Sequence, residues 1–99
     1  MVLTTTDTID GFKIQDYLGI VSGVGVNTRK AAFTFNVEKY FNSLEDSILQ
    51  IKEEAFQKIK ENAKKLNANA IVGISVDVET FPSTMYIMVS VTGTAVTVG

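Results

Sequence analysis

The feature that most constrains the fold is a helix end followed directly by two strands in the last third of the chain. The stretch Asn67-Ala68-Asn69-Ala70 closes a helical pattern, and apolar residues then alternate with small or polar ones from residue 71 to 79. Such period-2 alternation is typical of a strand with one apolar face. Pro82 marks a turn, and a second long strand follows over residues 85–98. We therefore expect two neighbouring strands immediately after a helix.

The preceding helix is marked at both ends. Ser43 suits the N-cap, and Asp46 three residues later approximates a capping box. Asn67 suits the left-handed position just after the last turn. Glu54 and Lys58 are spaced as a favourable i,i+4 pair. The apolar stripe that we expect to face the sheet consists of Leu44, Ile48, Ile51, Ala55, Ile59, Ala63 and Leu66.

The first quarter of the chain predicts two more strands. Residues 4–9 suit a short strand, Asp10-Gly11 is typical of a type I′ hairpin turn, and residues 12–26 form a long strand pattern. The long strand contains Gly19, Gly23 and Gly25, which we interpret as bends, a bulge or close backbone approach. A phosphate-binding loop is the alternative, but it needs a helix and a Walker-type Lys-Ser/Thr directly after the glycines.

Residues 27–42 form the segment that the sequence pattern constrains least. We expect either a short helix or an irregular arm. Its aromatic side chains either stack on a planar ligand or a base, or pack into a subunit interface. We favour packing, because aromatic clusters most often serve cores and interfaces. The segment contains Arg29, Lys30, Phe33, Phe35, Tyr40 and Phe41.

Together these elements predict one α+β domain over residues 1–99, a two-layer α/β sandwich of order ββαββ. One long helix covers one face of a mostly antiparallel sheet. The residues expected to face the helix are Val72, Ile74, Val76, Val78, Ile87, Val89 and Val91. The other face is expected to carry Gly73, Ser75, Tyr86, Met88, Ser90, Thr92, Val96 and Val98, with either Tyr17 and Val21 or Leu18 and Ile20. Because an uncovered face and long strand edges attract other surfaces, we expect self-association.

The chain lacks two residue types, and this limits the metal sites and catalytic mechanisms that it can have. The absence of Cys and His excludes disulfides, thiolate or imidazole metal sites, and Ser-His-Asp or Cys-His catalysis. No other base-plus-nucleophile pattern stands out, so we expect a non-enzymatic protein without an obligatory cofactor. A net charge of −2 with no basic cluster disfavours a nucleic-acid partner. No run reaches the ~20 apolar residues of a membrane span, so we expect a cytoplasmic protein without a membrane partner.

Asp77 and Glu79 are the candidate metal ligands. They are two residues apart on an expected strand, so their side chains share one face. With oxygen ligands from a neighbouring subunit, two carboxylates suit a hard cation such as Mg²⁺ or Ca²⁺. The alternative, which we prefer, is an ordinary solvated strand end.

Three stretches resemble the signature blocks of the YbjQ family, whose members are described as heavy-metal-binding proteins of uncertain function. They read TTTDTIDGFKIQDYLGIVSGVGV, LNANAIVGISVDVET and MVSVTGTAV. The resemblance implies a subunit akin to the dodecin-like folds, assembled into rings that are typically pentamers. Two places depart from the family pattern: residues 27–42 are shorter and lack a Gly-Gly-Arg stretch, and Ser75 stands where the family tends to carry Asp.

The preferred hypothesis is therefore a non-enzymatic, ring-forming homo-oligomer that binds a ligand or partner. The alternative is a protein that binds a small molecule or a metal ion at sites between subunits. By analogy to the dodecin fold, that small molecule would resemble a flavin.

Overall fold

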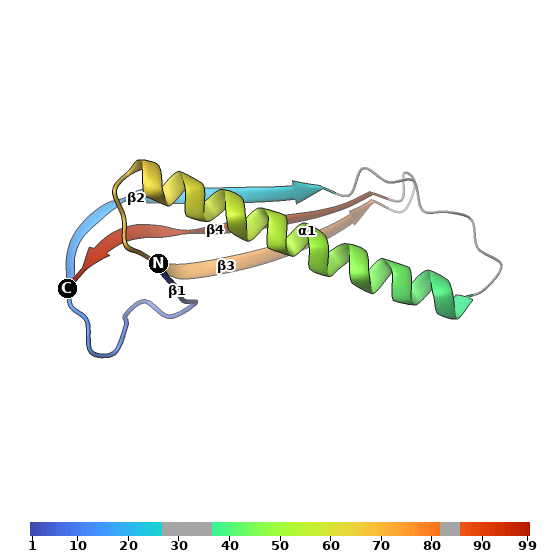
Figure 1. Ribbon diagram of the computed structural model, residues 1–99, viewed down its shortest axis with the longest axis horizontal. Coiled ribbons are helices and arrows are strands. Elements are labelled where there is room, and N and C mark those ends of the chain that lie inside the picture. Colours follow the sequence, from blue (N-terminus) through green and yellow to red (C-terminus); the bar gives the residue numbers. More distant parts are fainter. Residues whose placement is uncertain (27–36, 82–85) are drawn as a thin grey trace.

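The computed structural model describes residues 1–26, 37–81 and 86–99, except for the side chains of residues 37–45. Its elements are β1 (Val2–Leu3), β2 (Ile14–Val26), α1 (Val37–Lys65), β3 (Ala70–Phe81) and β4 (Tyr86–Val98). The strands form one sheet in the order β1-β3-β4-β2, and α1 crosses one face of it (Figure 1). The predicted α+β architecture with the order ββαββ is confirmed.

The N-terminal segment differs from the predicted hairpin. The strand expected over residues 4–9 was wrong, because β1 contains only Val2–Leu3 and pairs in parallel with the start of β3. Residues 4–8 form a loop held by side-chain hydroxyls. The hydroxyl oxygens of Thr4 and Thr6 lie 2.7 Å apart, and the Thr6 hydroxyl donates to the Thr8 carbonyl oxygen at 2.6 Å. Such local bonds compete with a strand ladder, which explains why the Thr-rich stretch is a loop.

The helix begins earlier than predicted. α1 starts at Val37, so Ser43 lies inside the helix and is not its N-cap. Its end agrees with the prediction: Lys65 is the last helical residue, and Asn67 has a φ of 64°. Asn tolerates this left-handed conformation better than most residues, so it suits the turn that leads into β3.

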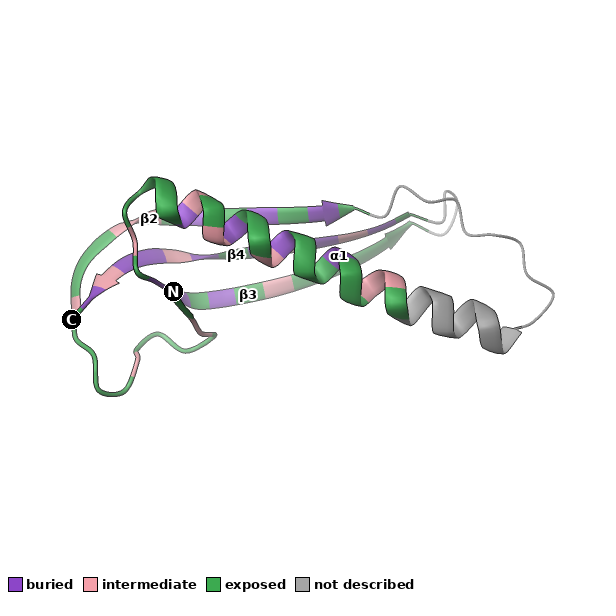
Figure 2. Cartoon of the chain, in the orientation of Figure 1, coloured by how far each residue is buried: buried purple, intermediate pink, exposed green. Residues whose placement is uncertain are grey.

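Most of the predicted helix stripe forms the core with β4, but Leu66 is 40% exposed and the side chain of Leu44 lies outside the described residues. Ile51, Ala55, Ile59 and Ala63 are buried against a cluster that includes Val91 (Figure 2). Ile87 and Val89 belong to the same cluster, as predicted. Fully burying an aliphatic side chain of this size contributes about 1.5–3 kcal/mol. This cluster is therefore the main source of stability for the two-layer arrangement.

A bulge in β3 changes which residues face the helix. Val72 pairs with Thr94 and Ser75 with Thr92, so β3 carries one extra residue in this interval. Gly73 has a φ of +61°, a conformation that side-chain-bearing residues rarely adopt. As a result Ile71 and Ile74 join the helix-facing cluster, whereas Val72 packs on the opposite face. The expectation that Val72 faces the helix was wrong, because unbroken alternation does not continue through a bulge.

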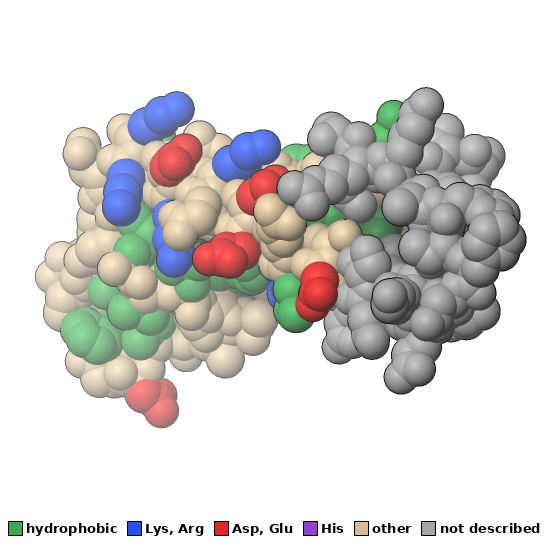
Figure 3. Space-filling view, turned by 45° about the vertical axis from the view of Figure 1, so that its right-hand side comes forward, with side chains coloured by type: hydrophobic (Ala, Val, Ile, Leu, Met, Phe, Trp, Pro, Cys, Tyr) green, Lys and Arg blue, Asp and Glu red, His purple; other side chains and the backbone are tan. Residues whose placement is uncertain are grey.

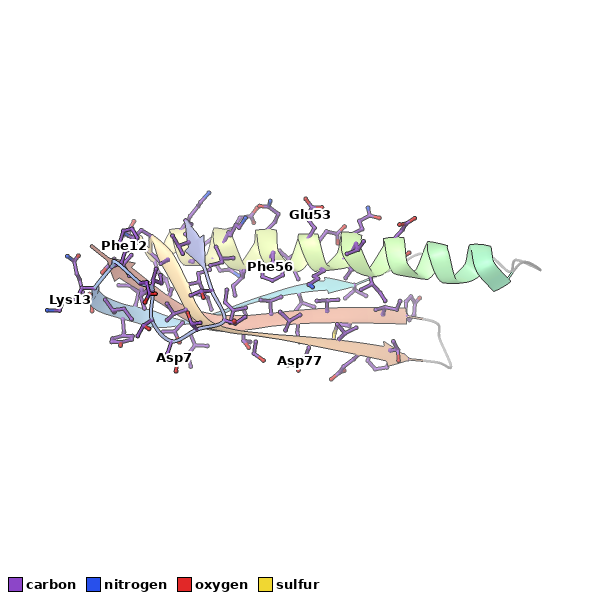
Figure 4. All side chains as sticks on the ribbon, turned by 90° about the horizontal axis from the view of Figure 1, so that it is seen from below. Asp7, Phe12, Lys13, Glu53, Phe56 and Asp77 are labelled. Carbon is purple, nitrogen blue, oxygen red and sulfur yellow. The ribbon has the colours of Figure 1, made fainter. Side chains whose placement is uncertain are left out.

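Two glycines bring α1 unusually close to β2. A Cβ atom built on Gly23 would lie 2.7 Å from the Ile59 amide nitrogen and closer still to the Ala55 carbonyl oxygen. A Cβ atom on Gly25 would lie 2.7 Å from the Ile51 Cγ2 atom. The strand interpretation of the glycine-rich run is therefore correct, and its glycines serve close packing. Beyond this contact the strands diverge from the helix, with β2 nearest to α1 and β3 farthest from it (Figure 4).

Helix side chains also bond to the outer edge of β2. The Lys58 Nζ atom donates to the Val24 carbonyl oxygen at 2.8 Å, in place of the predicted pair with Glu54. The Asn62 Nδ2 atom donates to the Ser22 carbonyl oxygen at 2.8 Å. These two bonds fix α1 along the edge of the sheet formed by β2.

We predict that Gly23→Ala destabilises the subunit by about 1–3 kcal/mol, because the added methyl group meets helix backbone that must shift. The free energy of unfolding would be measured by urea denaturation. Ser22→Ala is the control, since Ser22 is exposed on the other face and its backbone bond to Asn62 remains. An unchanged unfolding free energy in Gly23→Ala would show that the helix is not held as closely as described.

Candidate functional site

The face of the sheet opposite α1 is the candidate site, and we call it the open face. The register across β3, β4 and β2 gives three rows of side chains on it: Ser75–Thr92–Ser22, Asp77–Ser90–Val24 and Glu79–Met88–Val26. Phe81 and Tyr86 form a further pair at the end of these rows, and Tyr17 and Ile20 add to the β2 side. Hydroxyl and carboxylate groups thus lie beside a strip of apolar side chains.

The apolar strip is strongly exposed in the subunit. Ile20 is 84% exposed and Tyr17 69% exposed, and both lie on β2. Val24 and Val26 on the same strand are also exposed. The sequence analysis expected either Tyr17 and Val21 or Leu18 and Ile20 on this face, and neither pair is found. The face carries Tyr17 and Ile20 instead, because a register shift between Tyr17 and Gly19 turns Leu18 and Val21 toward the helix. Exposed apolar side chains arranged along one strand are typical of an interaction surface.

One end of this face is covered by the chain itself. Val72, Val96 and Val98 are buried there against the half-buried side chains of Ile9 and Ile14. The expectation that Val96 and Val98 are exposed was therefore wrong. The N-terminal loop is held in place because the Gly73 and Ile74 amides donate to the Thr6 and Thr4 carbonyl oxygens at 2.9 and 3.1 Å.

The helix side of the molecule has a different character. Lysine side chains and acidic side chains are interspersed over its surface (Figure 3). No helix in the described part of the chain is long and apolar enough to cross a membrane. A mixed-charge helix surface is an ordinary solvated one, so the open face is the stronger candidate for binding.

The predicted metal ligands lie on the open face. Asp77 and Glu79 share it as expected, with Ser90 and Met88 as their neighbours on β4. Asp77 points away from α1, whereas Phe56 lies between the helix and the sheet (Figure 4). Both carboxylates are exposed, and the described residues contain no group of three or more acidic, His or Cys side chains that could hold a metal ion. Within one subunit the pair offers only oxygen donors, which hard cations prefer.

The aromatic segment cannot be compared with its prediction in full. Phe33 and Phe35 lie outside the described residues, and the side chains of Tyr40 and Phe41 are not described. Residues 37–42 themselves belong to α1, so the helical alternative holds for that part of the segment.

The fold and the three signature stretches agree with a comparison against known families. The model of the YbjQ family, described as "Putative heavy-metal-binding", matches residues 1–99. The chain belongs to this family. A relative from Corynebacterium jeikeium, UPF0145 protein jk0060, is 39% identical over 103 residues and 98% of each chain is covered. UPF0145 protein GK1405 from Geobacillus kaustophilus is 35% identical, with 97% of this chain and 96% of the relative covered.

A solved structure supports the same YbjQ-type fold. A crystal structure of a protein with unknown function from Pediococcus pentosaceus, assigned to the DUF74 family, superimposes with a TM-score of 0.69. The alignment covers 100% of this chain and 98% of the other at 21% sequence identity. This similarity concerns the fold.

The donor atoms of this YbjQ chain do not fit the soft metals among the heavy metals that the family description refers to. Soft and borderline metals prefer thiolate and imidazole ligands. The whole chain has no Cys and no His. Asp77 and Glu79 supply carboxylate oxygens, which favour Mg²⁺ or Ca²⁺ over a heavy metal.

We therefore predict that the protein retains no stoichiometric zinc, copper, nickel or cadmium. The protein would be loaded with each metal, dialysed against metal-free buffer and measured by elemental analysis by mass spectrometry. An Asp77→Asn/Glu79→Gln variant serves as the control for weak carboxylate binding. One tightly held transition metal per subunit in the wild type would contradict this assessment of the donor atoms.

Proposed function

We propose that this protein is a cytoplasmic, non-enzymatic homo-oligomer that closes into a ring. Five subunits are the expected number, by its resemblance to the YbjQ family. In this proposal the assembled ring, and not the isolated subunit, presents the surface that binds a ligand or partner.

The observation that carries the proposal is the exposure of the apolar strip on the open face. Ile20 is almost fully exposed and lies one strand away from the buried Val96. Removing apolar surface from water contributes roughly 25 cal/mol per Å², so covering this strip with another copy is favourable. The neighbouring side chains Ser22, Ser90 and Thr92 are small and permit close approach of a second surface.

The non-enzymatic part of the proposal has a chemical basis. The open face has acidic and hydroxyl groups, but the chain has no His or Cys to act as general base or nucleophile. The described residues contain no buried polar or charged side chain. Catalytic groups usually occupy partly desolvated environments that shift their protonation, so this face is better suited to binding.

Native mass spectrometry at micromolar concentration tests the assembly directly. We expect a multiple of the 10.8 kDa subunit mass, with five the expected multiple. A protein that stays at the subunit mass under these conditions would contradict the proposal.

Ile20→Asp tests whether the open face forms the interface. Because Ile20 is exposed in the subunit, the substitution should leave the isolated fold almost unchanged, within about 0.5 kcal/mol. In an assembly it places an unpaired charge in an apolar contact, which typically costs ~3–5 kcal/mol. We expect size-exclusion chromatography to show dissociation into subunits. Ile20 is preferable to Met88 for this test, because an acid at Met88 would also lie opposite Glu79.

The matched control is Gln57→Asp, which adds the same charge at an exposed position on α1. This variant should keep the wild-type elution volume. If Gln57→Asp dissociates the oligomer and Ile20→Asp does not, then the helix forms the interface.

A further inference from the structure

The two edges of the sheet differ in what satisfies their backbone groups. β2 forms one edge, and β3 forms the other beyond its short pairing with β1 at Ala70 and Ile71. On β2 the outward carbonyls of Ser22 and Val24 accept bonds from Asn62 and Lys58 at 2.8 Å each. The β2 edge is thus partly closed by side chains of the helix.

The corresponding part of β3 is open. In an antiparallel sheet, backbone groups of successive residues point alternately to the two sides. The Ser22 carbonyl points outward, so the backbone groups of its partner Thr92 point away from β2 and toward Ser75 on β3. The backbone groups of Ser75 therefore point inward, toward β4. By alternation, the backbone groups of Val76, Val78 and Thr80 point outward from the sheet.

A bond at the start of this edge supports the same assignment. The Ile74 amide, two residues before Val76, donates outward to the Thr4 carbonyl oxygen at 3.1 Å. Beyond that bond, no residue in the described ranges is seen to pair with the outward groups of Val76, Val78 or Thr80. Val78 is itself 49% exposed. At about 3.3 Å per residue, the open edge from residue 76 to 80 is long enough to pair with a short strand.

The acidic pair determines what kind of strand fits. If two copies joined β3 to β3 about a two-fold axis, a register centred on Val78 would set Asp77 opposite Glu79 in both directions. Registers centred on residue 77 or 79 would set Asp77 against Asp77 or Glu79 against Glu79. Like charges directly opposite each other destabilise a strand pair. All three symmetric registers that pair more than one residue of the open edge are therefore disfavoured, which favours a different surface of the second copy at this edge.

We propose that the β3 edge from Val76 to Thr80 accepts an extended segment from a different surface of a second copy. This inference rests on the self-association proposed above and adds which edge of one copy receives a segment of the next. Contacts between unlike surfaces do not end at a dimer, and they close into a ring when the rotation between copies allows it. The open β3 edge is thus the acceptor side of each subunit, and the β2 edge is the poorer acceptor because side chains of α1 already bond to two of its carbonyls.

Proline substitution at outward-facing positions tests this directly in the full chain. Val78→Pro removes one outward N–H group and adds a ring where the incoming strand would bond, while the bonds to β4 remain. We expect the dissociation midpoint of the oligomer to rise at least about tenfold in protein concentration, since the bonds to the added strand are lost. Native mass spectrometry over a dilution series gives this midpoint, and far-UV circular dichroism checks the fold.

Val78→Thr is the matched control. Threonine has nearly the same shape as valine and is also β-branched, but it keeps the outward N–H group that proline removes. This variant should retain the wild-type oligomer. Should Val78→Pro fail to fold, Thr80→Pro makes the same test nearer to the end of the strand.

The possible outcomes distinguish a failure of the proposed function from a failure of this inference. A wild-type protein that is already monomeric overturns the proposed function and this inference with it. An oligomeric wild type with a folded Val78→Pro or Thr80→Pro variant that remains equally oligomeric overturns the inference alone. Equal dissociation of Val78→Thr and Val78→Pro also overturns it, because the loss would then not depend on the outward N–H group.

Discussion

The close contact between α1 and β2 determines most other features of this subunit. Gly23 and Gly25 have no side chains, so the backbone of α1 approaches β2 far more closely than a helix normally approaches a sheet. Lys58 and Asn62 then bond to the outer edge of the same strand. Because the helix is held toward β2, it leaves β3 at a greater distance (Figure 4). The β3 edge, which β1 pairs only at Ala70 and Ile71, is thus also far from the helix side chains that bond to β2.

The membership of the YbjQ family and the chemistry of this chain lead to different expectations about metals. A family description applies to a set of sequences, whereas ligand preference depends on the atoms that one chain supplies. Here those atoms are oxygens of exposed carboxylates and hydroxyls on the open face. Exposed side chains on a sheet face surround a cation less completely than a cleft does. In the proposed assembly Asp77 and Glu79 instead affect how copies can pair, because their charges oppose symmetric contact of β3 edges.

The features of the structure that depend on local periodicity could be predicted from the sequence. The helix stripe around Ile59 and the helix-facing residues of β4 follow fixed spacings, so both could be predicted. Asp77 and Glu79 share a face because both lie after the bulge, where alternation is regular again. The side of Val72 could not be predicted, since one extra residue before Ser75 reverses the side on which earlier residues lie.

The remaining differences come from contacts between distant parts of the chain. No local pattern indicates that Val2–Leu3 joins β3 in parallel, or that Ile9 and Ile14 cover Val98. The bond from Lys58 to β2 spans 34 residues and replaced a plausible local pair with Glu54. A lysine amino group near an unsatisfied edge carbonyl has a better partner there than an exposed carboxylate, since surface ion pairs contribute little.

The unequal edges also bear on how such a subunit avoids uncontrolled aggregation. A sheet with two open edges can add copies at both ends, and unlike contacts that do not close produce filaments. In this chain one edge is occupied by Lys58 and Asn62, and the other carries Asp77 and Glu79 beside its open groups. Strand pairing is thereby restricted to one edge and to partners without opposing acids. That restriction limits the number of ways in which copies can join, and the rotation between joined copies then determines whether a chain of them closes into a ring.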